Sequence, residues 1–93
     1  MEDSIREIAR IFAGTRDEKL IYGFLRQLLT GAELREIGSR WKLVRMLHRG
    51  MSQREIARRL GVSLCKITRG SRELKKKDSP FRKILDAEEK SHG

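Results

Sequence analysis

Residues 52–74, SQREIARRLGVSLCKITRGSREL, place six basic side chains among regularly spaced apolar and small residues. Counting from Gln53, Ala57 is fifth, Gly61 ninth and Ile67 fifteenth, which is the spacing of a helix-turn-helix. A small residue at Ala57 lets the second helix cross closely over the first, and Gly61 tolerates the positive φ of the turn. Such a unit inserts its second helix into the major groove of DNA. The alternative is an ordinary helical hairpin with a glycine turn.

The contacts that hold the two helices together can also be assigned. The apolar side chains expected between them are Ile56, Leu60, Val62 and Ile67. Ser63 can cap the second helix, because its hydroxyl can accept a hydrogen bond from a free backbone N–H of the first turn. The residues then expected to face the base edges are Leu64, Cys65, Lys66 and Thr68.

The charge of the chain supports a polyanionic partner. The 93 residues carry a net charge of +9, but residues 34–83 hold sixteen basic and four acidic side chains, a net charge of +12. The two ends, 1–33 and 84–93, are close to neutral with net charges of −1 and −2. A basic stretch that is internal and keeps its apolar periodicity is typical of a folded surface that binds nucleic acid.

Other classes of protein are not expected. No apolar run approaches the ~18–20 residues of a membrane span, so none is predicted. An anionic membrane surface is the weaker alternative to nucleic acid for the basic charge, and no membrane partner is predicted. The single cysteine, Cys65, cannot form an internal disulfide, which favours the reducing cytoplasm. Paired carboxylates, metal-ligand clusters and an activated nucleophile are missing at usable spacings, so neither an enzyme nor a metal site is predicted. A small nuclease is the weaker alternative.

Helix signals recur along the chain and predict an all-α fold. The expected helices span 4–13, 16–29, 31–49, 52–60, 63–75 and 80–89. Possible capping boxes are Ser4/Glu7, Thr15/Glu18, Thr30/Glu33 and Ser52/Glu55, and Ser79-Pro80 marks a further start. Glycines at positions where helices can end or turn are Gly14, Gly50, Gly61 and Gly70. We expect one domain over 1–93, with a helical core at 1–50, a DNA-reading head at 52–75 and a C-terminal helix at 79–90.

The first two helices carry apolar stripes, such as Ile5, Ile8 and Phe12, that a small chain cannot all bury by itself. They either cap the core of their own chain or pack against a second copy, and the sequence favours the second copy mildly. Trp41 lies on the apolar stripe of the long third helix and is expected in the core.

Several segments between residues 28 and 75 resemble the tryptophan repressor family. These are Leu28-Leu29-Thr30, Glu33, Gly38-Ser39-Arg40, Arg49-Gly50, Met51-Ser52-Gln53-Arg54-Glu55, Ile67-Thr68-Arg69-Gly70-Ser71 and Leu74-Lys75. The resemblance implies a six-helix fold, an intertwined homodimer and one helix-turn-helix head per chain. It also implies L-tryptophan as corepressor, with no other cofactor, and repression of genes for tryptophan biosynthesis or uptake.

The resemblance implies a ligand site between core and head. Arg40 and Arg69 would stack on the two faces of the indole, a role that a planar guanidinium fills and an ammonium does not. Arg69 would also hold the ligand carboxylate, with Thr30 of the other chain. Backbone carbonyls near Gln27 and Leu29 would accept from the ammonium, and Val44 and Gly70 would line the site. Without the resemblance, solvated or phosphate-bound arginines would be the simpler interpretation.

The resemblance also implies how the dimer meets its operator. Two heads about 34 Å apart would read a near-palindrome in double-stranded DNA. Arg54 would donate to a guanine edge, which suits its two parallel N–H groups. Residues expected on phosphates are Gln53, Ser71, Arg72, Lys75 and Lys76.

Two residues depart from the family pattern. Glu73 stands where a small neutral residue is usual, and it could pair with Arg69 or repel a ligand carboxylate. Lys66 replaces a smaller polar residue and could hold Glu73, the ligand carboxylate or DNA. A helix-turn-helix regulator of the same fold, with a different effector or none, is therefore the alternative function.

Overall fold

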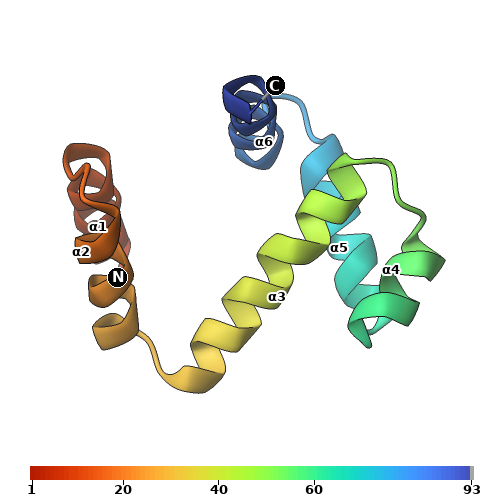
Figure 1. Ribbon diagram of the computed structural model, residues 1–93, viewed down its shortest axis with the longest axis horizontal. Helices are drawn as coiled ribbons and strands as arrows, with labels where there is room; N and C mark the ends of the chain where they lie inside the picture. The colour runs from red at the N-terminus through yellow and green to blue at the C-terminus, as the bar shows by residue number, and fades with distance from the viewer. Residues whose placement is uncertain (93) are drawn as a thin grey trace. The chain divides into compact units, whose positions relative to one another are not determined.

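The computed structural model describes residues 1–92 and consists of six α-helices, with no strand among these residues. The helices are α1 (Glu2–Gly14), α2 (Glu18–Leu28), α3 (Gly31–His48), α4 (Gln53–Leu60), α5 (Leu64–Lys75) and α6 (Pro80–His92) (Figure 1). The predicted all-α class and the order of the six helices are confirmed. The chain forms two compact units, Met1–Arg35 and Glu36–Gly93, which are described separately. No helix of the described part is both long and apolar enough to cross a membrane.

The first unit is a pair of amphipathic helices with little interior of its own. The rings of Phe12 and Phe24 meet edge to face at 5.9 Å between centroids. Neither α1 nor α2 contains a buried residue, and large apolar side chains such as Ile5, Leu20 and Leu28 remain about half exposed. The apolar stripes predicted from the sequence therefore form, but this unit does not bury them.

Two of the four predicted capping boxes are wrong. Helix α1 begins at Glu2, so Ser4 lies inside its first turn instead of at the N-cap. Thr15 follows α1, and its hydroxyl donates to the carbonyl of Ile11 at 2.7 Å. The N-cap of α2 is Asp17, whose carboxylate accepts from the amide of Leu20 at 3.2 Å. The carboxylate of Asp17, which is closer to the apolar stripe of α2, therefore caps this helix in place of the hydroxyl of Thr15.

The other predicted helix starts are confirmed. Thr30 and Glu33 form a complete box, with bonds of 2.9 and 3.1 Å in the two directions. Ser52 caps α4 through the amide of Glu55, and Ser63 caps α5 through the amide of Lys66. These caps fix where the helices of the second unit begin.

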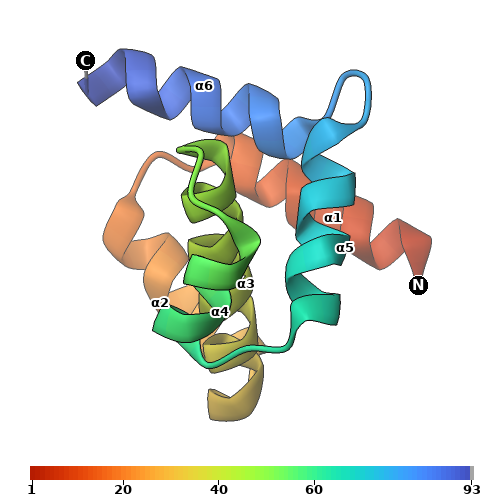
Figure 2. The same cartoon turned by 90° about the vertical axis from the view of Figure 1, so that its right-hand side faces the viewer.

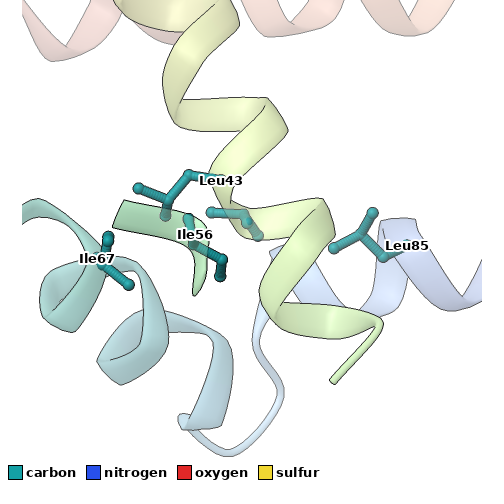
Figure 3. Packing of buried hydrophobic residues seen from close by; sticks show 5 residues of the cluster. Leu43, Ile56, Ile67 and Leu85 are labelled. Atoms are coloured by element: carbon teal, nitrogen blue, oxygen red, sulfur yellow. The ribbon is translucent and has the colours of Figure 1, made fainter. Parts of the chain in front are cut away.

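The second unit has one apolar core built from α3, α4, α5 and α6. Ile56, Ile67 and Val44 are fully buried, and Leu43 and Leu85 are 3% exposed. Figure 3 shows Leu43, Ile56, Ile67 and Leu85 converging from these four helices. Partly buried side chains pack around this core, and Trp41, Leu60 and Val62 among them were predicted to do so. The full set is Trp41, Met46, Leu47, Met51, Ala57, Leu60, Val62, Leu74 and Phe81. The helix-turn-helix thus packs on the second half of α3.

Gly70 lies within α5 and does not end a helix, so that part of the glycine prediction is wrong. A Cβ at this position would lie 2.6 Å from Cδ2 of Leu43 and 3.6 Å from Cγ2 of Val44. The absence of a side chain therefore permits α5 to approach α3 closely. Gly50 and Gly61 do adopt positive φ, and Gly14 is the last residue of α1.

Helix α6 packs on α5 and is fixed near the end of α3 (Figure 2). Ser79 is almost fully buried, and its hydroxyl accepts from the amide of Arg82, so α6 starts at Pro80 as predicted. His48, at the end of α3, lies 2.8 Å from Asp86 and 3.3 Å from Glu89 of α6. These contacts set the position of α6 relative to the core.

Candidate DNA-reading helices and ligand pocket

Helices α4 and α5 form a helix-turn-helix with the geometry that the spacing predicted. Gly61 closes α4 in the left-handed conformation, with φ 65° and ψ 26°. Its amide bonds to the carbonyl of Ala57 at 2.9 Å, which ends the helix in a tight turn. Helix α5 begins three residues later, at Leu64, with Ser63 as its N-cap. Figure 2 shows the short connection between α4 and α5. Because Ile56 and Ile67 are both fully buried between the helices, their mutual angle is set by the core.

Most side chains predicted to meet DNA lie on the surface of these two helices. The exposed ones are Arg54, Leu64, Cys65, Lys66, Thr68, Arg72, Lys75 and Lys76. Leu64 is 57% exposed although it is a large apolar residue at the start of α5. This exposure leaves Leu64 free for an apolar contact, and its contact with a base edge stays a prediction.

Two predicted DNA contacts are less free. Gln53 is half-buried, and its Oε1 accepts from the hydroxyl of Thr68 at 3.2 Å, so these residues tie the starts of α4 and α5 together. Ser71 is only 7% exposed. Its side chain has little surface to offer a phosphate, and its predicted role gains no support from this position.

Glu55 organises the basic surface of α4. Its carboxylate accepts hydrogen bonds from Arg58 and from Nε of Arg59. The hydrogen bonds from Arg58 and then Arg59 hold the pKa of Glu55 below its ordinary value, and the bond to Glu55 raises the pKa of Arg58. Arg54 makes no such pair within the described residues, so it differs from its two neighbours on the same helix.

The second unit contains a pocket of about 520 Å³ between α3, α5 and the start of α6. Its lining residues are Glu36, Ser39, Arg40, Leu43, Val44, Val62, Lys66, Arg69, Gly70, Glu73 and Phe81. Four of the six residues predicted for the ligand site, Arg40, Val44, Arg69 and Gly70, therefore line one pocket. Leu29 and Thr30 belong to the first unit, and their part in a ligand site stays a prediction.

One carboxylate joins two of the cations of the pocket. Oε1 of Glu36 accepts from Arg40 at 3.3 Å and from Nζ of Lys66 at 3.4 Å. Lys66 stands in the first turn of α5, so this ion pair connects the second helix of the helix-turn-helix with α3. The sequence suggested Glu73, the ligand carboxylate or DNA as the partner of Lys66. In the structure its partner is Glu36, which the sequence analysis did not predict.

The other pocket carboxylate is also engaged. Glu73 accepts from Nζ of Lys76 at 3.0 Å and is 42% exposed. The pair with Arg69, one of the two possibilities raised for Glu73, does not form among the described residues. The guanidinium of Arg69 has no ion pair or hydrogen bond within the described residues. Arg69 is therefore an unpaired cation of the pocket, and it lies one helical turn before Glu73, which pairs with Lys76.

Sequence reasoning missed Glu36, Leu43 and Phe81 as parts of this pocket. A signal for the first two exists, because Glu36, Arg40, Leu43 and Val44 follow the spacing i, i+4, i+7 and i+8 along one face of α3. Phe81 gives no such signal, because it reaches the pocket only through the packing of α6. Among the described residues, no group of three or more His, Cys, Asp or Glu could hold a metal ion.

The chain has a helix-turn-helix with exposed polar and basic residues, and this unit packs on the long helix α3 beside a charged pocket. This fold and site are those of a DNA-binding transcription regulator. The family model for the Trp repressor protein matches residues 4–89. The chain belongs to the Trp repressor family.

Similar proteins support this assignment. The chain is 39% identical over 72 residues to a Trp operon repressor homolog of Chlamydia trachomatis serovar L2, a match that covers 76% of this chain and 77% of that protein. The same identity and coverage hold for the homolog of serovar D. The homolog of Chlamydia caviae is 37% identical over 73 residues, which cover 77% of this chain and 72% of that protein. The chain is thus a regulator of the Trp repressor type.

Proposed function

We propose that this chain is a homodimeric, sequence-specific repressor that binds its operator when L-tryptophan occupies the pocket of the second unit. The observation that carries the proposal is the position of Arg40 and Arg69 on the same pocket, on α3 and α5. An aromatic ring between two guanidinium planes gains stacking and cation–π contact on both faces. Leu43, Val44 and Phe81 supply the apolar surface that an indole needs.

The position of the pocket also supports an effect of the ligand on DNA binding. Arg69 and Lys66 belong to α5, the helix that reads the bases, whereas Arg40 belongs to α3. A ligand held between α3 and α5 favours one orientation of the reading helix. Only a ligand that binds this orientation more tightly than others shifts the population toward it. L-tryptophan is proposed to act in this way as the corepressor, with the cytoplasm as its place of action.

The first unit supports a homodimer. Its two helices have strongly apolar faces and no buried residue in the single chain. Exposed Ile5, Leu20, Tyr22 and Leu28 would be costly for an isolated chain, since burying each large apolar side chain contributes about 1.5–3 kcal/mol. A second copy, intertwined with the first through these helices, covers them and brings Leu29 and Thr30 of the partner to the ligand.

The second candidate is a regulator of the same fold with another effector or with none. The observation in its favour is that two carboxylates, Glu36 and Glu73, line the pocket. A regulator without an amino acid effector would bind its operator equally well in the absence and presence of L-tryptophan.

The proposal is tested by selecting binding sites from random double-stranded DNA with the full-length protein, in parallel with and without a saturating concentration of L-tryptophan. The expected result is enrichment of a near-palindrome with half-sites one helical turn apart, only when tryptophan is present. Identical enrichment in both arms supports the second candidate. Sedimentation equilibrium of the same sample should give twice 10.8 kDa, and a stable monomer would exclude the shared core.

A further inference from the structure

We infer that Glu73 reads the ammonium group of an amino acid ligand while Arg69 reads its carboxylate, so that the site is specific for the zwitterion. This inference rests on the proposed function, in which an aromatic amino acid occupies the pocket. It gives Glu73 a role as a specificity-determining residue that discriminates between ligands with the same ring and different charges.

The two residues are placed for such a task. Arg69 and Glu73 both line the pocket and lie one helical turn apart on α5. Side chains at i and i+4 of a helix are neighbours, with Cβ atoms about 5–6 Å apart. A cation and an anion on neighbouring positions of one pocket wall suit an amino acid, which carries its ammonium and its carboxylate on the same carbon atom.

Arg69 and Glu73 are both available to bind the charged groups of a ligand. Arg69 has no ion pair or hydrogen bond within the described residues, so a ligand carboxylate displaces no protein partner. Glu73 uses Oε1 for Lys76, a contact between side chains that are 59% and 42% exposed. Such a solvent-exposed pair is weak, so an ammonium in the pocket can share the carboxylate or replace the lysine.

The other carboxylate of the pocket is less suited to this role. Glu36 is shared by Arg40 and Lys66 through one oxygen. An ammonium at Glu36 would compete with two cations of the protein, whereas at Glu73 it would compete with Lys76 alone. The end of the pocket near Glu36 and Lys66 therefore lacks a favourable place for the positive end of the ligand.

The test uses three ligands that share the indole ring: L-tryptophan, indole-3-propionate without the ammonium, and tryptamine without the carboxylate. Their dissociation constants are measured by titration calorimetry on the full-length wild type and on Glu73→Gln, which keeps the shape and removes the charge. A charge-assisted hydrogen bond changes affinity roughly ten- to hundredfold. In the wild type, L-tryptophan is expected to bind at least tenfold more tightly than either analogue.

In Glu73→Gln the preference for L-tryptophan over indole-3-propionate is expected to fall at least tenfold. The variant should bind L-tryptophan more weakly and indole-3-propionate as tightly or more tightly, because the repulsion of its carboxylate is gone. The preference over tryptamine should change less, since it depends on Arg69. Glu7→Gln removes the same charge outside the pocket and is the matched control, and thermal melting confirms that each variant is folded.

Two results overturn the inference and leave the proposed function intact: an unchanged preference in Glu73→Gln, or a loss of preference in Glu36→Gln instead. A wild-type protein that does not bind L-tryptophan at all would overturn the proposed function, and this inference with it. The two failures are therefore distinguishable in one set of titrations.

Discussion

Nζ of Lys66 lies 3.4 Å from Oε1 of Glu36 and joins the first turn of the DNA-reading helix to the long helix α3. The same oxygen accepts from Arg40, which the proposal places on one face of the ligand ring. Glu36 thus connects a pocket arginine with Lys66, a residue predicted to contact DNA. Ligand occupancy and the position of Lys66 are expected to influence each other through this contact.

Removal of the charge on Glu36 tests this connection. In Glu36→Gln, Lys66 is released for phosphate and a negative charge near the DNA-facing surface is lost. Operator affinity is expected to rise roughly two- to tenfold at low salt, and the dependence on salt concentration should steepen by about one additional phosphate contact. Fluorescence anisotropy at several salt concentrations measures both effects. Weaker binding by this variant would show that the ion pair holds α5 in its competent position.

Arg54→Ala tests base reading. Arg54 is exposed at the start of α4 and unpaired within the described residues, so its loss is expected to remove about 1–3 kcal/mol of discrimination between operator and random DNA. Competition between labelled operator and random duplexes measures the ratio. Arg59→Ala is the matched control, because Arg59 is engaged by Glu55. An equal loss on all sequences would assign Arg54 to phosphate contact.

Gly70→Ala tests the close approach of α5 to α3. A new Cβ would lie 2.6 Å from Leu43 and must displace it, and overpacking of this kind costs about 1–3 kcal/mol. The midpoint of chemical unfolding is expected to fall. Gly38→Ala, in α3, meets nothing within 4 Å and should stabilise the helix by about 0.5–1 kcal/mol. A Gly70→Ala protein as stable as the wild type would refute the tight packing.

Acid titration of stability tests the network at Glu55. Because hydrogen bonds from Arg58 and Arg59 lower the pKa of Glu55 in the folded chain, this carboxylate stabilises the fold above its unfolded pKa. That contribution is lost as the pH falls below the ordinary value of 4.5 and through the lowered folded value. Wild type should therefore melt at a higher temperature than Glu55→Gln at pH 7, and the two should converge as the pH falls below 4.5. A constant difference over this range would contradict the assignment.

The elements whose causes are local were predictable from the sequence. Gly61 ends α4 because its positive φ is a property of that residue, and Ser63 caps α5 because its hydroxyl reaches an amide three residues away. The capping boxes predicted at Ser4 and Thr15 are wrong, although they rest on the same kind of local pattern. The short pattern occurs by chance, and Asp17, nearer the first apolar residue of α2, caps the helix instead.

The cross-helix contacts of the pocket were not predictable in the same way. Glu36 and Lys66 are 30 residues apart, and their pairing depends on the distance between α3 and α5, which Gly70 permits. Likewise, His48 meets Asp86 only because α6 packs across the end of α3. Arg40 and Arg69 were named from family resemblance; their spacing alone gave no reason to place them together.

The central claim is that L-tryptophan in the pocket controls operator binding, and operator affinity with and without L-tryptophan tests it most directly. Coupling between two sites typically amounts to about 1–3 kcal/mol, or roughly 5- to 150-fold in affinity. The wild type is expected to bind its selected operator at least fivefold more tightly with saturating L-tryptophan, and Arg40→Ala is expected to lose this gain. Equal affinities of the wild type in both conditions would contradict the account.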